Sequence, residues 1–225
     1  MKMKLMLAAT ILLMVPMLVV AQPSSDRFEI EISAFEQLDD SISYTDNAIL
    51  FVGSSSIRMW RTLAEDMAPM PVINRGFGGS TIPEVTKYAD RIISVHQPEM
   101  LVLYAGENDL ANDTATAEDA LGHFKDFYSY MNKNLPETSV FFLSIKPSVA
   151  RKKFWPKMHK ANTKIRRFID KKPNFYFVDV ASPMLDDEGN ALKDIFIEDQ
   201  LHMNAKGYSL WTATLKPVLR KHYED

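Results

Sequence analysis

The chain contains no cysteine among its 225 residues. This absence excludes disulfide bonds, thiolate metal sites, a cysteine nucleophile and a lipid-modified cysteine behind a leader peptide. The chain also lacks a strong charge of either sign, because 26 basic and 29 acidic residues give a formal net charge of -3. A nearly neutral chain has no electrostatic preference for polyanions, so we expect no nucleic-acid partner.

Long apolar runs are absent except at the N-terminus. Lys2 and Lys4 are followed by an apolar stretch over residues 5–20 and by small residues that end at Ala21. This order is typical of a secretory signal peptide, so we predict that residues 1–21 are cleaved off and that the protein is exported to the periplasm or outside the cell. An uncleaved anchor is the alternative, but the run is shorter than the ~20 residues that a membrane span prefers.

The remaining part of the chain, about 200 residues, fits one domain with a full core. No internal repeat divides it. Residues 22–46 have a mixed, polar composition, so we expect them to form a surface segment that packs on the domain. The domain itself is expected to cover residues 47–225.

Short apolar runs without polar alternation recur along this domain. Such runs are typical of strands that are covered on both faces, as in a parallel sheet. We therefore predict five strands, at residues 49–52, 72–73, 100–104, 140–143 and 175–178.

Stretches with helical spacing lie between the predicted strands. The clearest stripe of apolar residues covers 117–135, where Thr116 and Asp119 are placed to cap the start of a helix. Alternation of strands and helices predicts an α/β fold, a three-layer α/β/α sandwich around a five-stranded parallel sheet. Further helices are expected at residues 82–93, 155–169 and 205–219, the last kinked or split by Pro217.

Four polar or glycine-rich segments follow the strands. If the strand order is 2-1-3-4-5, the first three segments meet at one edge of the sheet, where open parallel sheets bind ligands. The fourth lies just before the last helix. The segments are residues 53–56 (Gly-Ser-Ser-Ser), 74–81 (Asn-Arg-Gly-Phe-Gly-Gly-Ser-Thr), 106–109 (Gly-Glu-Asn-Asp) and 199–202 (Asp-Gln-Leu-His).

Each segment can supply a group that acyl transfer requires. A serine at a strand-to-helix turn can present its hydroxyl, and a glycine-rich loop lets backbone N–H groups approach an oxyanion. The amide of Asn108 could donate a further hydrogen bond to the same oxygen. Asp199 and His202, three residues apart, can share one side of a turn, so that the carboxylate binds one imidazole nitrogen and the other faces the serine.

These four segments, in this order, resemble the blocks of the SGNH hydrolases, also called the GDSL esterase and lipase family. The resemblance extends from residue 49 to the C-terminus. By position it makes Ser55 the nucleophile, Gly79 and Asn108 oxyanion-hole residues together with the N–H of Ser55, and His202 the base with Asp199 as its partner. It implies a flavodoxin-like fold and hydrolysis of esters or thioesters without a metal or an organic cofactor.

The nucleophile block departs from the family pattern in one respect. The usual Gly-Asp-Ser-Leu is replaced by Gly-Ser-Ser-Ser, so three consecutive serines leave the nucleophile open when the residues are taken alone. We prefer Ser55 over Ser54 and Ser56 because two residues separate it from the last apolar strand residue, Val52, as in the family block.

Residues beside the four segments are candidates for substrate contact. Phe77 and Tyr104 flank the segments and could line an acyl or sugar pocket, and Arg151 follows the fourth strand. We expect the basic residues of that region to form a solvated face, with binding of an anionic substrate as the alternative. Its other members are Lys146, Lys152 and Lys153. Large aromatic residues on helices are expected in the core; these are Trp60, Trp155 and Trp211.

Other chemistries are weaker interpretations. Glu107 and Asp109 could be taken for the two carboxylates of a glycosidase, but adjacent side chains diverge, so we expect Asp109 to bind backbone groups of neighbouring loops. No metal site is expected, because the remaining histidines lack acidic partners at ligand spacing; they are His96, His123, His159 and His222.

We therefore predict an exported serine esterase that acts on a small-molecule or oligosaccharide ester, with an acetylated carbohydrate favoured. A lysophospholipid, another lipid or a thioester is the alternative substrate, and a sugar hydroxyl could replace water as acceptor. A non-catalytic carbohydrate-binding or envelope protein that keeps the fold is the rival from another class. The oligomeric state stays open.

Overall fold

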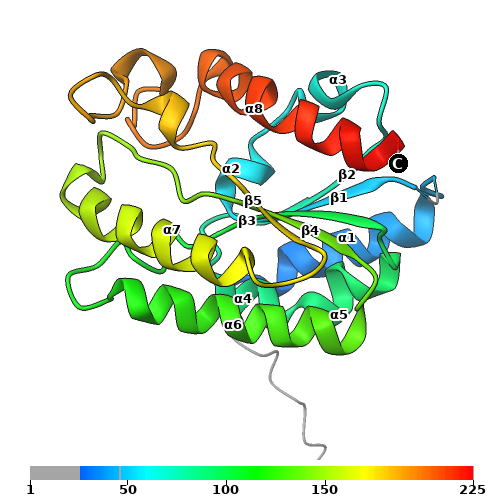
Figure 1. The fold of residues 1–225 in the computed structure, drawn as a ribbon. Coiled ribbons are helices and arrows are strands. Elements are labelled where there is room, and N and C mark those ends of the chain that lie inside the picture. The colour runs from blue at the N-terminus through cyan, green and yellow to red at the C-terminus, as the bar shows by residue number, and fades with distance from the viewer. Residues whose placement is uncertain (1–25, 46, 225) are drawn as a thin grey trace, which may run out of the picture.

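The computed structural model describes residues 26–45 and 47–224 (Figure 1). The predicted signal peptide, residues 1–21, lies outside the described residues. Five parallel strands form one sheet in the order β2-β1-β3-β4-β5, which confirms the predicted order. The strands are β1 (Ile49–Gly53), β2 (Val72–Gly76), β3 (Met100–Tyr104), β4 (Ser139–Leu143) and β5 (Phe175–Val178).

The register of β2, β1 and β3 aligns the carboxyl ends of these three strands. Gly53 at the end of β1 lies beside Gly76 of β2 and Tyr104 of β3. Every residue of β1 and β3 is buried, which accounts for the continuous apolar runs in the sequence. The polar segments that follow these strands therefore emerge side by side at one edge of the sheet.

Helices cover both faces of the sheet, so the fold is the predicted three-layer sandwich (Figure 1). One layer holds α1 (Glu29–Ser41), α4 (Ile82–Lys87), α5 (Ala89–Ile92), α6 (Ala117–Asn134) and α7 (Trp155–Ile169). The other holds α2 (Ser55–Arg58), α3 (Leu63–Met67) and α8 (Ala205–Glu224). Short 3-10 turns lie at η1 (Ser94–His96), η2 (Lys152–Phe154), η3 (Ser182–Met184) and η4 (Lys193–Ile195).

Local capping explains where two of the helices start. Thr116 and Asp119 form the predicted capping box of α6, and Thr81 and Glu84 form another at the start of α4. Pro217 lies inside α8 without splitting it, so of the two expected outcomes, a kink or a split, the split is wrong. The buried side chains of α8 lie on both sides of the proline, so packing on the sheet holds the helix together where one hydrogen bond is lost; they include Trp211, Leu215 and Leu219.

The described part of the N-terminal segment packs on the domain. Its helix α1 follows Phe28, and both Phe28 and Ile32 are buried in the core of that layer. Arg91 of α5 binds Glu29 and Glu36 on the helix, which fixes it along α5. Between residues 26 and 224, position 46 apart, no helix is both long and apolar enough to cross a membrane.

Candidate active site

Ser55 starts the helix that follows β1. Gly53 has φ +132°, and a Cβ there would lie 1.9 Å from the carbonyl oxygen of Tyr104, so only glycine lets β1 end this close to β3. The N–H of Ser54 donates to that carbonyl at 2.9 Å and holds the turn. Ser54 and Ser56 are both 2% exposed, whereas Ser55 is half-buried with its hydroxyl toward His202.

Ser55, His202 and Asp199 form one hydrogen-bonded chain. His202 Nε2 lies 2.9 Å from Ser55 Oγ, and His202 Nδ1 lies 2.5 Å from Asp199 Oδ2. The other oxygen of Asp199 accepts from the backbone N–H groups of Leu201 and His202, both at 2.9 Å. The carboxylate therefore fixes the imidazole ring and the turn that carries it.

The Asp199 carboxylate is held in its charged form. Burial is the largest single influence and acts to raise its pKa, but the imidazole of His202 and the two backbone N–H groups outweigh it. Together they lower the pKa of Asp199 to about 2. A charged carboxylate at this position favours the imidazolium that forms when His202 accepts a proton.

Gly79 and Asn108 line the same pocket as Ser55 and His202. Gly79 has φ +77°, and a Cβ there would meet no atom within 4 Å, so its backbone faces open space. Within the described residues, the N–H groups of Ser55 and Gly79 have no hydrogen-bond acceptor. Asn108 Nδ2 donates one hydrogen to the carbonyl of Ser80 at 3.0 Å, which leaves its second hydrogen for a ligand.

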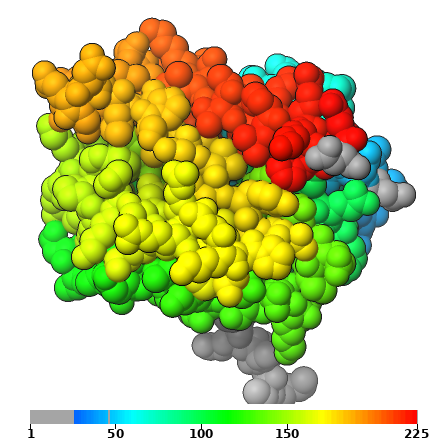
Figure 2. All heavy atoms as spheres, viewed as in Figure 1, coloured from blue at the N-terminus to red at the C-terminus, as the bar shows by residue number. Residues whose placement is uncertain are grey.

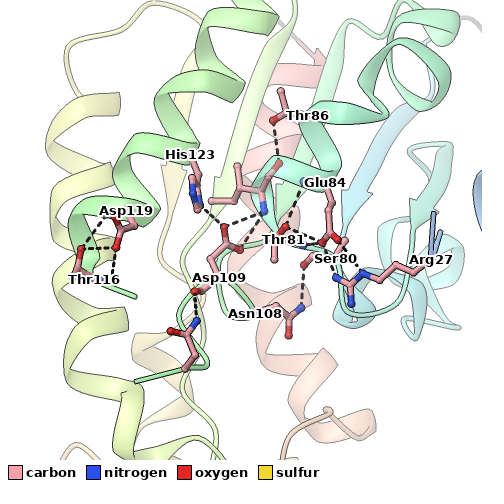
Figure 3. A network of polar contacts seen from close by, with 12 residues as sticks. Arg27, Ser80, Thr81, Glu84, Thr86, Asn108, Asp109, Thr116, Asp119 and His123 are labelled. Carbon is pink, nitrogen blue, oxygen red and sulfur yellow. Dashed lines mark hydrogen bonds and ion pairs between the residues drawn. The ribbon is translucent and has the colours of Figure 1, made fainter. Parts of the chain in front are cut away.

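Asp109 ties the Asn108 loop to the start of α4 (Figure 3). Its carboxylate accepts from the N–H of Ile82 at 3.1 Å and lies 2.8 Å from His123 Nδ1. Burial raises the pKa of Asp109, although His123 and the Ile82 N–H act against it. The expectation that Asp109 binds backbone groups of a neighbouring loop is thus confirmed.

The N-terminal segment supports the glycine-rich loop from the outside. Arg27 donates to the carbonyl of Gly79 at 3.2 Å. It also pairs with Glu84 at 2.8 Å (Figure 3). Glu31 of α1 accepts from the N–H of Gly78 at 3.4 Å and pairs with Arg58 at 3.1 Å. Contacts from α1 and the residues before it therefore reach the loop that carries Gly79.

A buried ion cluster forms part of the pocket wall, which Glu107, Lys146 and Arg151 line. Glu107 Oε2 lies 3.0 Å from Lys146 Nζ and accepts from Tyr104 at 2.8 Å, and Glu107 Oε1 lies 3.4 Å from Arg151. The side chains of Glu107 and Lys146 are only 5% and 1% exposed. We call these four residues the Glu107 cluster.

The Glu107 cluster holds two of the loops that surround Ser55. Lys146 Nζ donates to the carbonyl of Leu201, the residue before His202, at 2.8 Å, and Arg151 donates to Asn108 Oδ1 at 2.9 Å. Burial lowers the pKa of Lys146, and the charge of Glu107 opposes that shift. Burial and the same carboxylate raise the pKa of Tyr104 well above its ordinary value.

Several expectations about residues near the site are wrong. Phe77 packs in the core against Phe28, and Tyr104 is fully buried with its hydroxyl on Glu107, so neither lines the pocket. Lys146 belongs to a buried ion pair and not to a solvated face. Arg151 does line the pocket, as does Arg58, which the sequence analysis did not identify. The spacing of Arg58 after Ser55, one turn along α2, was the available signal.

The pocket itself is small and polar. It has a volume of about 190 Å³ and is lined by groups from all four segments, among them Ser55, Gly79, Asn108 and His202. In the described ranges 26–45 and 47–224, no group of three or more His, Asp or Glu side chains is placed to hold a metal ion. A nucleophilic hydroxyl, a base and unpaired N–H donors that meet at one small pocket can carry out acyl transfer.

Comparison with known proteins places this geometry in context. The chain is 25% identical over 170 residues to platelet-activating factor acetylhydrolase IB subunit alpha1 of Rattus norvegicus, covering 72% of this chain and 70% of that protein. The crystal structure of a GDSL-like lipase from Bacteroides thetaiotaomicron matches with TM-score 0.73 and 20% identity, over 85% of this chain and 98% of that one.

A carbohydrate esterase family 3 structure from Talaromyces cellulolyticus matches with TM-score 0.66 and 16% identity, over 80% of this chain and 99% of that one. At these identities the two structures establish the fold alone. The model of the GDSL-like lipase/acylhydrolase family matches residues 40–210, which include all four segments. The chain therefore belongs to the GDSL-like lipase/acylhydrolase family.

Proposed function

We propose that this chain is an exported serine esterase that removes acetyl groups from carbohydrates. The observation that carries the proposal is the hydrogen-bonded chain from Asp199 through His202 to Ser55, which ends at a pocket with unpaired N–H donors. Export rests on the signal-like pattern of residues 1–21.

The first half of the reaction forms an acyl-enzyme. Ser55 Oγ attacks the ester carbonyl carbon while His202 Nε2 accepts the hydroxyl proton. The negative charge on the former carbonyl oxygen is stabilised by the N–H groups of Ser55 and Gly79 and by Asn108 Nδ2. The intermediate collapses, the C–O bond to the alcohol breaks, and the imidazolium returns its proton to the leaving alkoxide.

The second half releases the acid. A water molecule takes the place of the alcohol, His202 accepts one of its protons, and the hydroxide attacks the acyl carbon. The same three donors stabilise the second tetrahedral intermediate. When the bond to Ser55 Oγ breaks, the proton on His202 returns to the serine, and the carboxylic acid leaves.

The size and lining of the pocket support a short acyl group. Its volume is about 190 Å³, and two arginines, Arg58 and Arg151, line it, so a long hydrocarbon chain would have to pack against charged groups and remove them from water. An acetyl group is short enough for this volume and contains no long hydrocarbon chain. A carbohydrate alcohol is supported by the carbohydrate esterase that shares the fold, and the name of the rodent relative makes an acetylated lipid the second candidate.

A panel of esters tests the proposal directly. We expect wild-type protein to hydrolyse p-nitrophenyl acetate with a kcat/KM at least about tenfold above that for the octanoate, because the longer chain does not fit the pocket. Acetate release from acetylated xylose and from an acetylated lysophospholipid separates the two alcohols. Hydrolysis of the octanoate at or above the rate of the acetate would contradict the short-acyl proposal.

The pH dependence should reveal a single ionisation on the acid side. Asp199 has a pKa lowered from 3.8 to about 2, so it stabilises the fold above pH 3.8 and loses that contribution only as the pH falls toward 2. The carboxylate therefore stays charged above about pH 4. Because His202 is the one base in the proposed mechanism, we expect log kcat/KM for p-nitrophenyl acetate to fall on the acid side with a limiting slope of one.

Stopped assays in buffers of constant ionic strength measure this profile. Circular dichroism at each pH separates loss of activity from loss of structure. A limiting slope of two, with the protein still folded, would mean that a second group beside the imidazole must be deprotonated.

A further inference from the structure

A second and larger cleft lies beside the reaction pocket. It has a volume of about 640 Å³ and is formed by the loop between β4 and α7 on one side and by the segment between β5 and α8 on the other. The same segment carries Asp199 and His202 at its far end. Figure 2 shows the orange atoms of this segment above the yellow-green atoms near residue 150, at the left of the view.

One short loop separates the cleft from the reaction pocket. Val149 and Lys152 line the cleft, whereas Arg151 lines the pocket around Ser55. The N–H of Ala150 donates to the carbonyl of Gln200 at 3.0 Å, so the loop is fastened to the turn that carries His202. A ligand with its ester at Ser55 therefore has to extend past only this loop to reach the cleft.

Trp155 gives the cleft an aromatic wall. Of the three tryptophans, Trp60 and Trp211 are 1% and 0% exposed, whereas Trp155 is half-buried and lines the cleft. The expectation that Trp155 lies in the core is therefore wrong. The structure leaves part of the indole toward the cleft, where it can stack on the apolar C–H face of a sugar ring.

Polar side chains surround this aromatic wall. Asp186, Glu188 and Asp194 contribute carboxylates, Asn190 an amide, and the remaining charges come from Lys152 and Lys193. Three acidic and two basic groups nearly balance, so the cleft has little preference for a charged ligand. Five charged side chains are costly to desolvate against a hydrocarbon chain, whereas sugar hydroxyls can hydrogen-bond to them.

We infer that this cleft is a subsite for the neutral sugar units next to the acetylated unit, so that the preferred substrate is an acetylated oligosaccharide. The inference rests on the proposed function, because it assumes that the acetyl ester lies at Ser55. Sugar units that stack on Trp155 would then hold a long substrate across the loop at Ala150.

The kinetic test compares substrates of different length. Trp155→Ala should lower kcat/KM for an acetylated oligosaccharide by about tenfold or more, mainly through KM, and leave p-nitrophenyl acetate within about twofold of wild type. Phe154→Ala is the matched control, because it removes a neighbouring aromatic ring that does not line the cleft. Lys152→Ala, an exposed cleft residue, gives a second variant that should fold if Trp155→Ala does not.

A binding experiment separates failure of the subsite from failure of the proposed function. The Ser55→Ala protein is titrated with the deacetylated oligosaccharide, and tryptophan emission is recorded with Trp155 present or replaced by phenylalanine. A saturable change that needs Trp155 supports the subsite even if no ester is hydrolysed. Three results for Trp155→Ala would each overturn the subsite: equal loss of activity on p-nitrophenyl acetate and on the acetylated oligosaccharide, no loss on either substrate, or a loss confined to long-chain acyl esters.

Discussion

Replacement of Ser55 by alanine should lower kcat for p-nitrophenyl acetate at least about 10⁴-fold, with little change in the free energy of unfolding. The hydroxyl lies 2.9 Å from His202 Nε2, and no other side chain of the described residues makes that contact. Without it, the base can only activate water, and the two-step route through an acyl-enzyme is closed. The oxyanion-hole donors remain in this variant, so only the slow hydrolysis that they support without a nucleophile should be left.

The neighbouring serines supply the controls. Ser54→Ala and Ser56→Ala remove hydroxyls from residues that are each 2% exposed, so both should keep activity within about tenfold of wild type. A fluorophosphonate probe should label the wild type and both controls and leave Ser55→Ala unlabelled, with the adduct mapped by mass spectrometry. An adduct on Ser54 or Ser56, or full activity of Ser55→Ala, would contradict the assignment; labelling of none would favour a binding protein.

The sheet was predictable because its strands consist largely of apolar residues, and those of β1 and β3 are buried throughout. The apolar runs at residues 100–104 and 175–178 coincide with β3 and β5 to the residue. The prediction for β2 was shorter than the strand, since Asn74 and Arg75 break the apolar pattern. Asn74 bonds backbone groups of Ile57 and Gly76, and the terminal nitrogens of Arg75 bind Asp39 and Tyr44, so both polar residues have partners within the fold, although Arg75 Nε has none among the described residues.

The four segments of the site were predictable from residue types that are visible in the local sequence. The order of the parallel strands then brings the segments to one edge of the sheet. The charge pairs beside them were not predictable, because pairing of Glu107 with Lys146 depends on how two separate loops pack. A lysine after a strand carries no mark that separates a solvated side chain from a buried one. Phe77 and Tyr104 show the same limit, since a residue beside a functional loop can face the core.

Replacement of Glu107 by glutamine should lower the free energy of unfolding by about 3–5 kcal/mol. The substitution keeps the shape of the side chain and removes its charge, which leaves Lys146, 1% exposed, without the carboxylate at 3.0 Å. The cost is that of an uncompensated buried charge. Urea denaturation followed by circular dichroism measures it. Glu118→Gln, which breaks the exposed pair of Glu118 with Lys164, should change stability by less than about 1 kcal/mol.

The same substitution should also slow the reaction, because the cluster holds groups on both sides of Ser55. Lys146 binds the carbonyl before His202, and Arg151 binds the amide oxygen of Asn108. In the double variant Glu107→Gln, Lys146→Met, no ammonium group remains to be compensated, so we expect stability to recover by about 1–3 kcal/mol relative to Glu107→Gln. Activity should not recover with it, since Lys146→Met removes the donor to the Leu201 carbonyl. If stability and activity both recover in the double variant, the cluster acts on stability alone. If neither recovers, loss of the Glu107 charge does not destabilise the protein through Lys146.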